Sequence, residues 1–195
     1  MAPYSFIFER RIYMSKKYEF TGETKFYKGV TLHRIRACKD FGIVKAGDIG
    51  GWIEKEFNLS HQNNAWVSDE AWVFDEALIN GDAWVSDEAR VSGNAWVSDE
   101  ARVSGNAWVS GNAWVSDDAR VSGNADYTTI KGFGTIGRNT TFFKCSDGSI
   151  RVNCGCFHGT LKEFKKQVKK TRTGKIKKEY LMIADLMKMH FSNKT

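Results

Sequence analysis

Proline, cysteine and long apolar runs are scarce in this sequence. A single proline among 195 residues leaves turn formation to asparagine, aspartate and the 18 glycines. Four cysteines are too few for a disulfide scaffold. No run approaches the roughly 18 apolar residues of a membrane helix. The short apolar stretch 4–8 is followed by Glu9, Arg10 and Arg11 rather than by a small-residue cleavage site. These absences predict a cytoplasmic protein with no membrane segment.

Charge is distributed unevenly along the chain. Residues 1–64 carry 11 Lys and Arg against 7 Asp and Glu, residues 65–130 carry 3 against 12, and residues 131–195 carry 15 against 4. The charge predicts three modules: a β-rich N-terminal cap module (15–64), an acidic central module (65–130) and a basic α+β C-terminal module (131–195). Residues 1–14 are predicted to be an extension, because MSKKYEF, from Met14 onward, reads as a natural beginning. The basic module is the place to look for an anionic partner, although lysines that only solvate helix surfaces would explain the same charge.

A six-residue repeat fills the central module. Alanine recurs at every sixth position from Ala65 to Ala125, and a valine or isoleucine follows two residues later in each hexad except the last, which has Tyr127. Residues two apart in a strand point to the same side, so these residues form an inward row, and the Asp/Gly and Glu/Asn pair turns the chain. Three hexads make a triangular coil, and successive coils stack on one another. An α-helix is excluded because a period of six keeps no helical face buried.

The run VSGNAWVSDEARVSGNAWVSGNAWVSDDARVSGNA resembles the hexapeptide repeat of left-handed parallel β-helices. The flanking segments 32–60 and 154–170 resemble modules that bracket such repeats in uncharacterised bacteriophage and prophage proteins of Firmicutes. The expected fold is mainly β. It is a left-handed parallel β-helix of about 3.7 coils with a small β-rich N-terminal cap and an α+β C-terminal module that ends in two helices.

The residue between each alanine and valine points outward, and six of these residues are tryptophans. Because a coil has three hexads, outward residues three hexads apart share a face. The first face has Trp66, Trp84, Arg102 and Arg120, the second has Trp72, Arg90, Trp108 and Asp126, and the third has Leu78, Trp96 and Trp114. Six exposed indoles exceed what a monomer usually tolerates, so we expect another subunit, a flanking module or a ligand to cover them, and we prefer a homo-oligomer. A self-supporting Trp/Arg ladder and a planar ligand such as a base or sugar are the alternatives.

The repeat also resembles the repeats of some enzymes. Hexapeptide acyltransferases are similar in fold and use a histidine as general base, usually beside a loop extruded from the coils. Zinc carbonic anhydrases on this fold need three histidines, and insect antifreeze β-helices expose threonine ladders. Here no histidine lies between His61 and His158, and the hexads are uninterrupted. We therefore predict that the protein is not an enzyme, with an acyltransferase that uses His61 or His158 as base in a site between subunits as the alternative.

Three cysteines and a histidine near the C-terminal end have the spacing C-x8-C-x-C-x-H. These residues, Cys145, Cys154, Cys156 and His158, are of the types that bind zinc in tetrahedral sites. The C-x-C spacing is less typical of zinc than C-x-x-C, and no second pair fixes the site. The preferred interpretation is that these are reduced cysteines on a short strand, with no metal and no cofactor.

Both flanking modules contain recognisable elements. Strands are predicted at 16–20, 31–38 and 47–54, with the open end of the coils covered by Phe41, Ile49, Trp52, Ile53 and Leu59. Thr160 and Glu163 form a capping box that starts a helix reaching about Thr171, and a second helix is predicted at about 177–191. The helices carry a basic patch suited to phosphates, made of Lys165, Lys166, Lys169, Lys170, Arg172, Lys175, Lys177 and Lys178.

These features together predict a non-enzymatic, phage-derived interaction or scaffold protein. The resemblance of the flanks to phage proteins implies a role in inhibition of a host defence system, of the anti-CRISPR type, by binding a host protein or nucleoprotein in the bacterial cytoplasm. Two alternatives are an acyltransferase-like enzyme and a protein that binds nucleic acid or nucleotides through the Trp/Arg faces and the C-terminal lysines.

Overall fold

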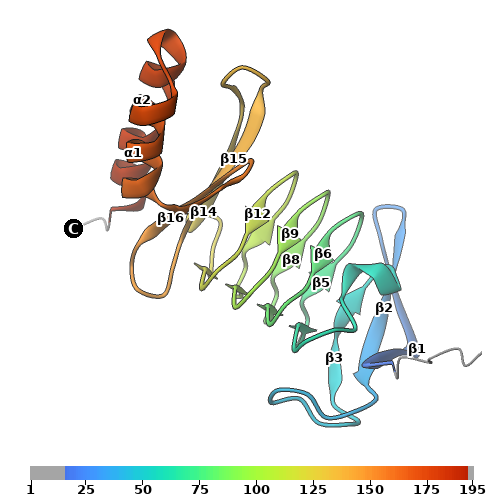
Figure 1. Ribbon diagram of the computed structural model, residues 1–195. Helices are drawn as coiled ribbons and strands as arrows, with labels where there is room; N and C mark the ends of the chain where they lie inside the picture. Colours follow the sequence, from blue (N-terminus) through green and yellow to red (C-terminus); the bar gives the residue numbers. More distant parts are fainter. Residues whose placement is uncertain (1–15, 193–195) are drawn as a thin grey trace, which may run out of the picture.

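The computed structural model describes residues 16–192, so the predicted extension at 1–14 lies outside the described residues. A parallel β-solenoid of about four turns forms the centre of the molecule. A strand-rich segment precedes it, and a small sheet with two helices follows it (Figure 1). The predicted mainly β fold built on a β-helix is confirmed.

Each hexad contributes one two-residue strand to the solenoid. Strands three hexads apart pair in parallel and in register, as Arg102 does with Trp84 on one side and Arg120 on the other. This pairing produces three narrow sheets, one for each side of the triangular coil. The strands are β4 (Trp66–Val67), β5 (Trp72–Val73), β6 (Leu78–Ile79), β7 (Trp84–Val85), β8 (Arg90–Val91), β9 (Trp96–Val97), β10 (Arg102–Val103), β11 (Trp108–Val109), β12 (Trp114–Val115) and β13 (Arg120–Val121).

Alanine and valine fill the interior of the solenoid, as the repeat predicts. The alanines from Ala65 to Ala119 and the aliphatic residues from Val67 to Val121 are all at most 1% exposed. Backbone hydrogen bonds join successive coils: the amide of Trp84 donates to the carbonyl of Ala101 at 2.9 Å. The corners need left-handed backbone, which aspartate and glycine supply at low cost, as at Asp87 (φ 57°) and Gly105 (φ 58°).

The N-terminal segment extends one side of the solenoid. An antiparallel hairpin of β1 (Tyr18–Tyr27) and β2 (Val30–Ala37) leads to β3 (Ile49–Ile53), which pairs in parallel with β5. The short 3-10 helix η1 (Glu56–Asn58) then leads into the first coil. Ile53 and Leu59 join the solenoid core as expected, whereas Ile49 is 51% exposed because it lies at the outer end of β3, away from the coils.

The C-terminal segment closes the other end. Its antiparallel sheet runs in chain order through β14 (Tyr127–Phe133), β15 (Arg138–Lys144), β16 (Ile150–Cys154) and β17 (Phe157–Thr160). The helices α1 (Leu161–Thr171) and α2 (Gly174–Phe191) follow, and Thr160 and Glu163 form the predicted capping box. One face of the sheet packs on the last coil, where Phe143 joins the solenoid core, and the other packs on the helices through Phe142 and Val152. No helix within residues 16–192 has the length and apolar character to span a membrane.

Candidate active site

The outward tryptophans do not share one environment. Trp66 is only 2% exposed, because Phe41 of the N-terminal segment packs edge-on against its indole with the ring centroids 5.3 Å apart. The expectation that Trp66 is an exposed face residue is therefore wrong. Trp72 is partly covered by the guanidinium of Arg90, 4.4 Å from its ring. The most exposed indoles of the solenoid are Trp96 and Trp108, at 40% and 39%.

The third face of the solenoid leads directly to a histidine. Trp96 and Trp114 stack nearly parallel, with centroids 5.1 Å apart and an interplanar angle of 7°. The imidazole of His158, on β17, stands edge-on to Trp114 at 4.4 Å. The chain separation of 44 residues between Trp114 and His158 is bridged by the C-terminal sheet, which places this edge strand against the last coil. An aromatic row thus ends in a titratable side chain that is itself exposed.

The hydrogen bonds around His158 fix its tautomer. The amide nitrogen of Asn153 donates to the carbonyl of Trp114 at 3.0 Å and to the hydroxyl of Ser116 at 2.9 Å. Its amide oxygen therefore faces His158 Nδ1, 3.0 Å away, and has to accept a hydrogen bond. Nδ1 consequently carries the proton of the neutral ring, and Nε2, which has no hydrogen-bond partner among the described residues, keeps a free lone pair. This is the arrangement of an oriented general base.

His61, the other base considered from the sequence, is arranged differently. Its Nδ1 accepts a hydrogen bond from the backbone amide of Lys17 at 3.2 Å, and its ring stacks on Tyr18 at 4.4 Å. The proton of the neutral ring therefore lies on Nε2, which leaves no nitrogen free to accept another. Burial lowers the pKa of His61 and favours this neutral form. His61 thus contacts the start of the N-terminal hairpin, and of these two histidines His158 has the geometry of a base.

The four residues of the zinc spacing are not brought together. Cys145 is buried beside Asp118, where burial raises the pKa of its thiol to about 12. Cys154 accepts a hydrogen bond from the hydroxyl of Thr140 at 3.1 Å and packs on the helix side of the sheet. His158 lies on the solenoid side. Among the described residues no group of three or more histidine, cysteine or acidic side chains is placed to hold a metal ion.

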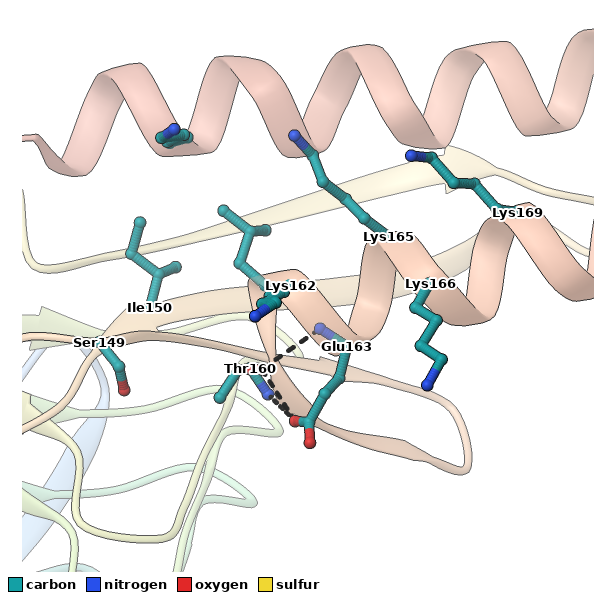
Figure 2. Close-up of a pocket in the computed structure, with 10 residues that line it drawn as sticks. Ser149, Ile150, Thr160, Lys162, Glu163, Lys165, Lys166 and Lys169 are labelled. Carbon is teal, nitrogen blue, oxygen red and sulfur yellow. Dashed lines mark hydrogen bonds between the residues drawn. The ribbon is translucent and has the colours of Figure 1, made fainter.

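The predicted basic patch is divided in the structure. Lys165, Lys166 and Lys169 line an open groove of about 930 Å³, to which Lys162 and Lys188 also contribute. In Figure 2 the side chains of Lys165 and Lys169 extend toward α2, and Ile150 forms part of the floor. Asp185 of α2 pairs with Lys165. The other residues of the predicted patch do not line this groove: Lys170, Arg172, Lys175, Lys177 and Lys178.

The groove and His158 share one edge strand. Thr160, which lines the groove, follows His158 by two residues on β17, a separation of roughly 7 Å along a strand. Apolar Ile150 and Leu161 together with five lysines suit a ligand that has both an extended apolar part and anionic groups. Asn153 could not be identified as a site residue from the sequence. Arg151 and Asn153 alternate with Ile150 and Val152, and the same alternation is typical of a strand whose polar side faces solvent.

Comparisons with known proteins agree with the repeat. The family described as the YdcK beta solenoid repeat matches residues 101–117. A curated relative from Escherichia coli (strain K12), named "Uncharacterized acetyltransferase YdcK", is 43% identical over 56 residues, which cover 28% of this chain and 17% of the relative. The chain therefore aligns with far less than two thirds of that protein. The likeness supports a β-solenoid, whereas the phage and Firmicutes resemblance of the flanks finds no counterpart among these matches.

The relative corrects the functional prediction. Its name is that of an acetyltransferase, which contradicts the prediction of a non-enzymatic phage scaffold and favours the acyltransferase-like alternative. The error has a physical source. The coils hold no histidine, but the C-terminal sheet folds back and places His158 against the last coil at Trp114.

Proposed function

We propose that this protein is an acyltransferase-like enzyme in which His158 is the general base. The main support for this proposal is a chain of hydrogen bonds. It runs from the last coil through Asn153 to Nδ1 of His158 and leaves Nε2 ready to accept a proton. The solenoid acetyltransferase among its relatives supports the reaction class.

Each group at the site has a defined task in this reaction. Nε2 of His158 takes the proton from a hydroxyl or amine of the acceptor as its oxygen or nitrogen bonds to the carbonyl carbon of a thioester donor. The carbon–sulfur bond then breaks, and the proton passes from Nε2 to the leaving thiolate. Asn153 positions the ring, and the exposed face of Trp96 beside Trp114 offers a flat wall for the acceptor.

The lysine groove fits the donor. Acyl groups carried as coenzyme A thioesters bring phosphates on one end of a flexible arm, and Lys162, Lys166 and Lys169 supply positive charge along α1. Ile150 and Leu161 supply apolar surface for the arm. Since Thr160 joins this groove to His158 along β17, the arm would run along the edge strand toward the base.

The test is thiol release from acetyl-coenzyme A in the presence of a panel of amines and hydroxyl compounds. We expect turnover by the parent protein, and a loss of about 10²- to 10⁴-fold in His158→Gln, the range for removal of a general base. Asn153→Leu removes the hydrogen bond to Nδ1 and should lower kcat more than it raises KM. His61→Gln and the exposed His190→Gln serve as matched controls and should keep the parent rate, with circular dichroism to verify folding.

Two results would reject this function. One is the absence of thiol release with every acceptor together with the absence of heat on titration with coenzyme A. The other is turnover that survives in His158→Gln but is lost in His61→Gln. The proposal depends neither on the predicted homo-oligomer nor on a cytoplasmic location, both of which stay predictions.

A further inference from the structure

A second pocket lies on the opposite side of the C-terminal sheet from His158. It has a volume of about 260 Å³ and is enclosed by the β16–β17 turn, the C-terminal end of α1 and the start of α2. Its walls combine guanidinium groups, thiols and aromatic rings, contributed by Arg138, Cys154, Cys156, Phe157, Phe164, Gln167, Val168, Thr171, Arg172 and Tyr180. None of the reaction steps proposed for His158 uses these residues.

Positive charge in this pocket lacks a counter-charge. Arg138 and Arg172 both line it, no carboxylate does, and neither guanidinium forms an ion pair within residues 16–192. One of them lies directly against the β16–β17 turn: a Cβ atom at Gly155 would come within 2.0 Å of Arg138 Nη1. Like charges at one pocket repel each other, and an anion bound between the two guanidiniums would relieve that repulsion.

The remaining walls indicate what the anion is attached to. Phe157 is half-buried at the pocket, and Phe164 and Val168 are buried behind it. Thr171 and Gln167 add polar groups at the α1 end. We propose that this pocket binds a small ligand with a phosphate or carboxylate head held by Arg138 and Arg172 and a compact apolar body against Phe157. This site goes beyond the proposed acyl transfer, because it shares no lining residue with the lysine groove and lies across the sheet from His158.

The thiol of Cys156 gives a direct readout. Cys156 is exposed in the pocket wall, and Cys38 is the other exposed cysteine among the described residues. In a Cys38→Ser background, the alkylation rate of Cys156 by the neutral reagent iodoacetamide is measured with increasing phenyl phosphate, benzoate or inorganic phosphate. We expect saturable protection by phenyl phosphate or benzoate, with the better of the two identifying the head group. Inorganic phosphate should protect only at higher concentration.

Variants test the role of the two arginines. Arg138→Gln and Arg172→Gln should each raise the half-protecting concentration about tenfold or more, because a charge-assisted hydrogen bond is lost. Arg102→Gln, the same change at an exposed position of the solenoid, should leave it unchanged. Protection by none of the three anions, or equal protection in the parent and both arginine variants, would overturn the proposal. Equal protection by inorganic phosphate and phenyl phosphate would refute the role of Phe157.

Discussion

Two glycines at solenoid corners separate the cost of backbone conformation from the cost of crowding. Gly105 and Gly111 both have left-handed backbone, with φ values of 58° and 69°. A Cβ atom at Gly105 would lie 2.6 Å from the carbonyl oxygen of Ser122 in the next coil, whereas one at Gly111 would have nothing within 4 Å. The difference arises because no further coil stacks on the corner at Gly111.

The expected magnitudes follow from this geometry. Alanine in left-handed backbone costs roughly 1–2 kcal/mol, a cost that Gly105→Ala and Gly111→Ala share. The contact with Ser122 is with backbone, so it can be relieved only by moving a coil, and overpacking of this kind adds about 1–3 kcal/mol. Since about 1 kcal/mol shifts Tm by about 2–4 °C in a protein of this size, Gly111→Ala should lose a few degrees and Gly105→Ala clearly more.

Thermal and urea unfolding, followed by far-UV circular dichroism and tryptophan fluorescence, measure the difference. The two probes should give coincident transitions in the parent protein before the variants are compared. A Gly111→Ala variant that is as unstable as Gly105→Ala, or less stable, would refute the assignment of Ser122 as the neighbour that crowds Gly105.

Three further changes test other parts of the structure. Val97→Asp places an unpaired carboxylate in the Ala/Val column and should abolish folding or cost several kcal/mol in urea unfolding, whereas Arg102→Ala should stay within about 0.5 kcal/mol of the parent. Hydrogen bonding by Lys25 in particular lowers the pKa of Glu70 to about 2, so stability from this group is present above pH 4.5 and is lost as the pH falls toward 2. Thermal unfolding across that range should show a smaller acid loss in Glu70→Gln than in Glu88→Gln, and equal losses would contradict this role. Thr160→Ala removes the α1 capping box and should cost about 1 kcal/mol, which chemical denaturation would detect.

The repeat made most of the fold predictable. Alanine and valine two residues apart fix which side of each strand is buried, and the Asp or Gly that follows supplies the left-handed corner. The environment of Trp66 was not predictable from the hexad, because the residue that covers it, Phe41, belongs to a different segment. A hexad specifies which side chains point outward, whereas their exposure depends on what packs over them.

The candidate site was predictable only in part. His158 was recognised as a candidate base, but its partners are Asn153 and Trp114, and Asn153 is in turn held by Trp114 and Ser116 of the last coil. Spacing along the sequence carries no signal for such a contact. The alternation of residues 150–154 shows that one side of β16 is polar, and it does not show that this side packs on the last coil.

The contact between His158 and Trp114 places the candidate site on one particular face of the solenoid. The hexads are nearly identical in sequence, so recombination between them would readily change their number. Three added hexads complete a coil: they lengthen the solenoid by about 4.8 Å and return a third-face residue to the position beneath the histidine. One or two hexads added between Trp96 and Trp114 break this arrangement, because Trp96 then no longer lies a whole number of coils before Trp114. Between Trp96 and Trp114 the solenoid can therefore lengthen only by whole coils if the two tryptophans are to stay on the face that meets His158.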